Sequence, residues 1–267
     1  MSGRLLTIVF ALLFLAGSSA LALAQIDDYG SWVGTPIEGS IGIGAVYAPD
    51  YDGADSSGYH ALPILNLRYG PVFLSSDKGL GVSFAFFDGA LELSPAVGYR
   101  FRRDEDDSPV LNGMGDASGQ VTLGGSALYH FTDTVSFGAK AFQGLSSDKG
   151  FAMDLRAAYQ NRAYERLTWS VAATTSLADQ KYHQTYFGVT PTQSARSGHK
   201  VYSPSAGFKD VGLGGSVDFF LTPSFSVDVF ARYRYLIGDA GDSPLVKAGS
   251  QNQFSTGLLF FFHIGGY

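Results

Sequence analysis

The stretch SVDVFARYRYL, residues 226–236, alternates between two kinds of side chain. One set is apolar or aromatic: Val227, Val229, Ala231, Tyr233 and Tyr235. The other set is mostly polar or charged: Ser226, Asp228, Phe230, Arg232 and Arg234. Successive side chains of a β-strand point to opposite faces. The stretch therefore predicts a strand with one apolar and one charged face. Whether a protein core or a lipid lies against the apolar face then decides the fold class.

The same alternation recurs along almost the whole chain after residue 36, and helical spacing fits these stretches less well. The candidate strands are 37–48, 60–69, 72–77, 80–87, 90–101, 119–131, 134–146, 150–160, 167–177, 209–221, 224–236 and 252–262. Several have the ~9–11 residues that a tilted strand needs to cross a bilayer. The pattern predicts about twelve strands, with the count left open at the short pair around residues 70–90.

The connections between these strands alternate in length. Tight turns are expected at 70–71, 88–89, 132–133, 161–166 and 222–223. Longer loops are expected at 49–59, 102–118, 178–208 and 237–251. Short turns on one rim and long loops on the other are typical of outer-membrane barrels, which have an even strand number. The sequence thus predicts an all-β protein, a transmembrane antiparallel up-and-down β-barrel.

Aromatic residues at the strand ends favour lipid over a protein core. Tyr47, Tyr99, Phe101, Tyr233 and Tyr235 lie near the long loops, and Tyr69, Tyr129, Phe131, Tyr159 and Trp169 lie near the tight turns. All share the apolar parity of their strands. Two aromatic girdles around an apolar band are typical of a lipid-facing barrel surface, whereas a soluble sandwich needs none.

The N-terminus indicates export. Arg4 precedes the apolar run LLTIVFALLFLAG (5–17), and Ala22-Leu23-Ala24 has the small-x-small form of a signal-peptidase site. An uncleaved anchor is the alternative, but the run is short for a spanning helix of ~20 residues. We expect residues 1–24 to be a cleaved signal peptide and 25–267 to be a single barrel domain in the outer membrane of a Gram-negative bacterium.

Composition excludes two other classes of protein. The 267 residues carry a formal net charge of -6, which is unlike the basic balance of a nucleic-acid-binding protein. Charged residues make up 16% and aromatic residues 14%, and this balance is unlike that of a disordered chain.

Four segments carry a family resemblance: VYAPDYDGADSSGYHALPILNLRYGPVFL (46–74), YFGVTPTQSARSG (186–198), SPSAGFKDV (203–211) and LIGDAGDSPLVKAGSQNQFSTGLLFFF (236–262). They resemble the MltA-interacting protein / OmpV family, most closely in PDYDG and GDAGDSPLV. The resemblance implies an outer-membrane barrel. In the name-giving branch it implies a scaffold that holds a lytic murein transglycosylase near a murein synthase. Other branches are porin-like or osmoregulated surface proteins, and no catalytic residues are agreed for the family.

The inward parity of the strands carries acids and bases in nearly equal number. They are Glu38, Arg68, Glu92, Arg100, Lys140, Asp154, Arg156, Asp218, Asp228, Arg232 and Arg234. In a small barrel, facing opposite charges would form a hydrogen-bonded network that fills much of the lumen. We expect such a filler, with Asp218 and Asp228 near Arg232 and Arg234. The alternative is a selective pore with an arginine ladder.

The loops offer little sign of catalysis. The acidic loop with Asp50, Asp52 and Asp55 and the run DEDD (104–107) could hold a divalent cation, but DEDD lacks the spaced ligands of a calcium loop. A solvated charge run, without metal or cofactor, is predicted there. His183 and His199 share one loop with Ser194, Ser197 and Asp179, but spacing alone does not define a triad.

The sequence therefore favours a non-enzymatic scaffold or binding protein of the envelope. Its expected contacts are outer-membrane lipid and lipopolysaccharide, with a lytic murein transglycosylase and a murein synthase as partners implied by the resemblance. A narrow porin-like channel is the alternative, and an outer-membrane hydrolase is a third, weaker one.

Overall fold

A computed structural model describes residues 37–146 and 150–265 of the chain. Its strands are β1 (Glu38–Pro49), β2 (Ser57–Tyr69), β3 (Val72–Ser75), β4 (Gly79–Val82), β5 (Phe84–Phe86), β6 (Leu91–Arg100), β7 (Gln120–His130), β8 (Val135–Gly144), β9 (Phe151–Tyr164), β10 (Leu167–Ala178), β11 (Gly207–Thr222), β12 (Phe225–Leu236) and β13 (Asn252–Ile264). The signal peptide expected at 1–24 lies outside the described residues and stays a prediction.

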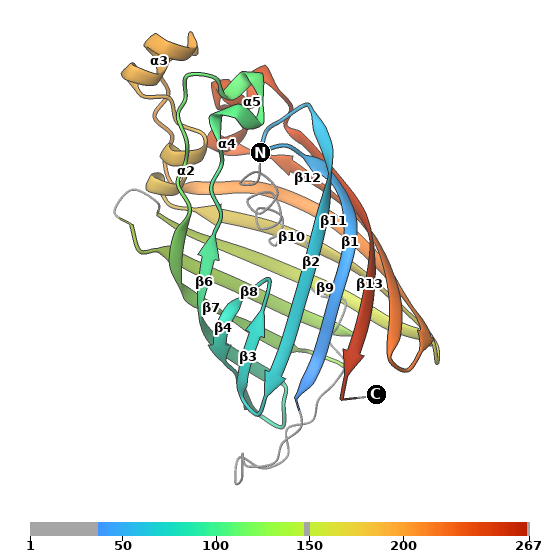
Figure 1. The fold of residues 1–267 in the computed structure, drawn as a ribbon. Coiled ribbons are helices and arrows are strands. Elements are labelled where there is room, and N and C mark those ends of the chain that lie inside the picture. Colours follow the sequence, from blue (N-terminus) through green and yellow to red (C-terminus); the bar gives the residue numbers. More distant parts are fainter. Residues whose placement is uncertain (1–36, 147–149, 266–267) are drawn as a thin grey trace.

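The strands form one antiparallel sheet that closes on itself (Figure 1). β1 pairs with both β2 and β13, sequential neighbours pair around the wall, and β4 closes the ring by pairing with β6. Each strand thus bonds to the next one along the chain, which is the up-and-down arrangement. The predicted all-β barrel is confirmed.

The 13 segments make a barrel of 12 strands, because β4 and β5 are two parts of one strand. Both pair with β6 in a single register, Leu80 opposite Val97 and Phe84 opposite Leu93. That register sets Val82 opposite Pro95. Proline has no N–H to donate to the ladder, so the pairing is interrupted there. Every strand expected from the sequence is present, including the short pair.

The two ends of the barrel differ as the loop lengths predict. The end with the four long connections, here the loop end, carries all the helices drawn in Figure 1. The opposite end, here the turn end, holds five tight connections, from β2–β3 to β11–β12, together with the start of β1 and the end of β13. No helix in the described part of the chain is both long and apolar enough to cross a membrane.

The apolar parity faces outward. Ile43, Leu213 and Val229 are 62%, 63% and 50% exposed, although all three lie within strands. Most aromatic residues assigned to the girdles are also exposed, among them Tyr99 and Phe131. Phe101 is an exception: it lies beyond the end of β6 and packs against a buried apolar cluster, so its assignment to the lipid-facing girdle is wrong.

That cluster reveals an apolar side of the lumen that strand parity alone did not indicate. It consists of Val46, Ala48, Leu62, Ile64, Phe230, Leu259 and Phe261, which lie on β1, β2, β12 and β13. Glycines on the same inward parity make room for its large side chains. A Cβ at Gly257 would lie 2.6 Å from the Phe230 ring, and one at Gly44 would lie 2.5 Å from Leu259.

This packing predicts that Gly257→Ala is destabilising by about 1–3 kcal/mol, because the new methyl group overpacks against the Phe230 ring. The free energy of unfolding, measured in lipid vesicles, should show this loss. Phe230→Leu in the same chain should restore part of it, whereas Phe230→Leu with Gly257 intact should only destabilise. An absence of any rescue would show that the clash is not with Phe230.

Candidate functional site: the capped mouth of the barrel

Four long connections form a folded cap over the loop end. This loop cap comprises 50–56, 101–119, 179–206 and 237–251. Its helices are η1 (Glu105–Asp107), η2 (Pro109–Leu111), α2 (Gln180–Tyr186), α3 (Pro191–Ser197), α4 (Gly238–Gly241) and α5 (Pro244–Ala248). One buried apolar cluster draws on all four connections: Tyr51, Ala54, Leu111, Met114, Val189 and Leu245. The loops therefore share a core of their own instead of extending separately into solvent.

Hydrogen bonds from side chains to backbone oxygens join the loops of the cap. Arg103 donates to the Tyr186 carbonyl at 2.9 Å, and Gln193 donates to the Met114 carbonyl at 2.7 Å. Ser243 donates to the Phe187 carbonyl at 2.6 Å. Each bond gives a partner to a backbone carbonyl that lies at the end of a helix or in a loop. Together the bonds favour a single conformation of the cap.

A four-residue ion network anchors the cap inside the barrel mouth. The guanidinium of Arg234 lies 2.7 Å from the carboxylate of Asp52 and 3.4 Å from that of Asp210. The Lys209 ammonium lies 3.1 Å from Asp52 and 3.4 Å from Asp210. Burial alone would raise the pKa of Asp52, but Arg234 and Lys209 hold it well below its usual range. Asp52 is therefore charged and ties loop 50–56 to the inner wall.

Two members of this network were missed in the sequence, for different reasons. Asp210 shares the inward parity of Asp218, so the alternation could have identified it. Lys209 has the outward parity, but a register shift between Ser176 and Leu177 of β10 leaves Lys209 opposite no residue. Such a β-bulge re-aims the extra residue, and Lys209 is only 8% exposed.

Four further predicted lumen charges have polar partners. Arg68 lies 3.6 Å from Glu92, and Lys140 lies 2.6 Å from Asp77, which was not predicted. Asp154 accepts a hydrogen bond from Ser176 at 2.8 Å. The register places Glu38 opposite Arg68 on the same face.

Arg100, also predicted to face the lumen, places its guanidinium 4.8 Å from the centre of the Tyr182 ring of α2. This cation–π contact joins β6 to the loop cap.

The expected pairing of Asp218 and Asp228 with the arginines is wrong. These two carboxylates lie opposite each other on β11 and β12 and are 5% and 2% exposed. The acids that pair with Arg234 are Asp52 and Asp210. Arg232 has no ion pair or hydrogen bond within the described residues, and its strand register places it beside Gly214. Arg156 shares the inward face of β9, opposite Thr174.

The acidic loops do not converge on a cation site. Asp50 accepts a hydrogen bond from Ser56, Asp52 enters the lumen, and Asp55 is exposed. No group of three potential metal ligands occurs in the described ranges.

The acidic run 104–107 is more than a solvated charge run. Glu105 accepts hydrogen bonds from the N–H groups of Gly113 and Gly115 at 3.1 and 2.8 Å. Both glycines have positive φ, which suits the turn that Glu105 holds.

The residues considered for a hydrolase serve the structure of the cap. The Nδ1 atom of His183 lies 2.6 Å from the Ser205 carbonyl, and His199 Nε2 lies 2.8 Å from the Val110 carbonyl. Asp179 accepts the N–H of Tyr182 as the N-cap of α2, and Ser197 donates to the Gln193 carbonyl. These bonds tie each side chain to a neighbouring backbone segment.

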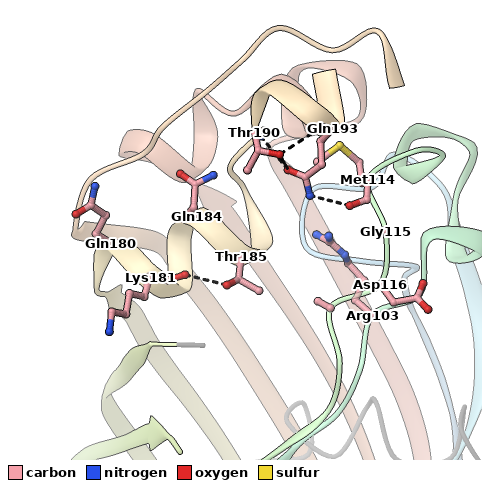
Figure 2. A pocket seen from close by; sticks show the side chains of 11 residues that line it. Arg103, Met114, Gly115, Asp116, Gln180, Lys181, Gln184, Thr185, Thr190 and Gln193 are labelled. Atoms are coloured by element: carbon pink, nitrogen blue, oxygen red, sulfur yellow. Dashed lines mark hydrogen bonds between the residues drawn. The ribbon is translucent and has the colours of Figure 1, made fainter. Parts of the chain in front are cut away.

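The cap also carries an open pocket of ≈ 440 Å³ (Figure 2). Gln180, Lys181, Gln184 and Thr185 of α2 face Arg103 and the 114–117 segment across it. Lys181 and Asp116 bring opposite charges to its lining.

The buried His183 makes the cap sensitive to pH. Burial lowers the pKa of its imidazole, the bond to Ser205 only partly opposes this, and Nε2 has no partner within the described residues. The unfolded cap therefore binds the proton more readily. The stability that neutral His183 gives the cap is fully present above a pH of ~6.5, the pKa of histidine in an unfolded chain, and it is lost as the pH falls below that value. We expect faster proteolysis within 179–206 at about pH 5.5 than at about pH 8.

Gln at this position provides the control, since it keeps a donor for the Ser205 carbonyl but does not titrate. His183→Gln should give cleavage rates that change less with pH. An unchanged pH dependence in this variant would assign the effect to another group.

A closed antiparallel barrel with an exposed apolar band, charged lumen and short turns at one end defines an outer-membrane-type β-barrel protein. The chain belongs to the family described as MltA-interacting protein MipA, which matches residues 41–263. No curated protein matches the chain.

Several solved outer-membrane proteins are similar to it in overall shape. The NanC porin has a TM-score of 0.49 and 7% identity, covering 83% of this chain and 98% of its own. The KdgM porin has a TM-score of 0.43 and 9% identity, covering 84% and 98%. An outer membrane channel from Pseudomonas putida F1 has a TM-score of 0.42 and 13% identity, covering 89% and 100%.

Proposed function

We propose that the protein is a closed outer-membrane barrel that acts as a scaffold or binding protein of the Gram-negative envelope, and not as an enzyme. The observation that supports this best is the anchored cap. Loop 50–56 contributes Tyr51 to the core shared by all four loops and Asp52 to the ion network inside the mouth. An open pore needs no such double attachment, whereas it helps to keep the mouth of a closed barrel shut.

The family description supplies the partner in this proposal. A lytic murein transglycosylase binds the barrel and is thereby held near a murein synthase. In outer-membrane barrels the short turns face the periplasm, where murein lies, so the turn end is the side available to these enzymes. Outer-membrane lipid, with lipopolysaccharide in the outer leaflet, surrounds the exposed apolar band.

The second candidate is a narrow anion-preferring channel. It is favoured by Arg232, which makes no ion pair in the described ranges, and by Arg156 and Arg234 on the same charged side of the lumen. An anion passing the mouth would meet these cations in succession. For the channel to conduct, the loop cap must open or leave a path beside it.

Conductance in planar bilayers separates the two candidates. A closed scaffold passes little or no current, and Arg232→Ser together with Arg234→Ser should open a leak and lower stability, because the second change frees loop 50–56. Large, steady, anion-selective current through the native protein would replace the scaffold with the channel.

Crosslinking in intact cells tests the partner directly. Recovery of a lytic transglycosylase with the crosslinked barrel supports the scaffold. A closed barrel that captures no murein enzyme would leave no basis for the tethering role.

A further inference from the structure

The barrel wall has a seam between β2 and β6, where no pairing among the described strands closes it. β2 has 13 residues, but β3 and β4 have only 4 each. Only Asn66–Tyr69 of β2 pair with β3, and β6 pairs with β4 no further toward the loop end than Val97. Within the described part of the chain, residues 57–64 of β2 and 99–100 of β6 therefore have a strand neighbour on one side only.

The backbone of β2 matches a free edge. Leu65 uses its N–H and C=O groups to bond Ser76, on the β3 side. Because these groups alternate between the two edges of a strand, those of Tyr59, Ala61 and Pro63 point toward the same side. Pro63 has no N–H at all, and proline within a sheet is typical of edges. No hydrogen bond from Ala61 or Pro63 to that side occurs within the described residues.

The seam lies at the height of the apolar band. Tyr59 and Tyr99 flank the seam at the loop end and are 82% and 51% exposed. They lie at the level of the aromatic girdle near the long loops. Ala61 and Pro63 come next on the outward face of β2, toward the turn end. In lipid, unpaired backbone groups are tolerated only where protein covers them or where they line a cavity. Side chains must therefore seal this part of the wall.

Phe101 is the side chain placed to seal it. It follows the last residue of β6, packs against the apolar cluster that includes Leu62 and Ile64 of β2, and its ring centre lies 4.9 Å from that of Tyr99. It thus lies on the β6 side of the seam and reaches an apolar cluster to which β2 contributes. Behind it the lumen wall is apolar, in contrast to the charged positions on β8 and on the loop-end parts of β11 and β12.

We propose that this seam is a lateral gate and that an acyl chain of an outer-leaflet lipid enters it when Phe101 moves aside. The chain then lies against Leu62, Ile64 and the rest of the apolar cluster. β1 and the strands from β7 to β13 each have a hydrogen-bonded strand on both sides, whereas the unpaired edge of β2 adjoins the apolar face of the lumen. This lipid site is independent of any murein partner or of conductance through the mouth.

Single cysteines test the gate cleanly, since the native chain has none. Leu62→Cys places a thiol behind the seam. Ala172→Cys is the matched control, because Ala172 also faces inward, on β10, where β9 and β11 pair along both edges. Both variants are folded into vesicles and exposed to a maleimide that partitions into the bilayer.

We expect Leu62→Cys to be labelled from the bilayer and Ala172→Cys to stay unlabelled. Adding Phe101→Ala should raise the Leu62→Cys rate about tenfold, which corresponds to about 1.4 kcal/mol in the gate equilibrium. Phe101→Leu should raise the labelling rate of Leu62→Cys by a smaller factor. This variant replaces Phe101→Ala in the test if the alanine variant does not fold.

Three results would overturn the proposal. One is a Leu62→Cys rate that both Phe101 variants leave unchanged. Another is equal labelling of Ala172→Cys, which would indicate entry unrelated to the seam. The third is equally fast labelling of Leu62→Cys by a charged, water-soluble maleimide, which would mean that the path opens to solvent and not to lipid.

Discussion

Replacing Asp52 by asparagine is expected to cost about 3 kcal/mol of unfolding free energy, because it removes one partner of a buried ion network. Lys209 and Arg234, 10% and 17% exposed in their side chains, would then share Asp210 alone. Asparagine keeps the size of the side chain, so the loss of unfolding free energy measures the effect of removing the charge and not the effect of a cavity. Denaturant unfolding in vesicles measures the change, and proteolysis of 50–56 shows whether the loop is released.

The same loop provides the control. Asp50 accepts a hydrogen bond from Ser56 at the surface and takes no part in the network, so Asp50→Asn should cost less than about 1 kcal/mol. Asp52→Asn leaves the Lys209 ammonium without the nearer of its two carboxylate partners. Adding Lys209→Met removes this cation, so the double variant should recover part of the unfolding free energy that Asp52→Asn loses. Equal effects of the two asparagine variants would mean that Asp52 does not anchor the cap.

Val229→Arg is expected to destabilise the barrel by about 2–4 kcal/mol, the cost of a cation near the midplane on a lipid-facing strand. Val229 is 50% exposed and lies near the middle of β12, on the outward face. The free energy of folding into lipid vesicles gives the magnitude, and slower insertion should accompany it.

Ser216→Arg is the matched inward change on the neighbouring strand. Ser216 pairs with Phe230, the residue next to Val229, and Asp218 lies two positions away on the same face. A cation there meets a carboxylate, so the variant should be less destabilised than Val229→Arg. If both variants insert equally well, the assignment of the two faces is wrong.

Strand parity predicted most of the wall, because the alternation of side chains is a local property of each strand. It indicated β3 and β4 despite their four residues each, and it assigned Val229 outward and Arg234 inward correctly. It failed where the alternation breaks: at the bulge that turns Lys209 inward, and at Phe101, which lies past the end of its strand.

The partners of the lumen charges depend on contacts between residues far apart in the chain. Asp52 and Arg234 are 182 positions apart and meet at 2.7 Å, and nothing near Asp52 in the sequence distinguishes it from Asp50. Likewise, the shared core of the loops joins Tyr51 to Leu245. Loops have no periodic pattern from which such contacts could be predicted.

The sequence by itself determined the barrel, a count of about twelve strands and the face that most strands turn to lipid, because each rests on periodicity and on the alternation of loop lengths. The tertiary structure alone decided that the loops cap the mouth, that Asp52 enters the lumen and that the wall has a seam beside β2. The physical reason is that closure sets the distances across the ring and the register of each strand pair. Those distances decide which charges neutralise each other and which strand edge, here that of Ala61 and Pro63, is left without a partner.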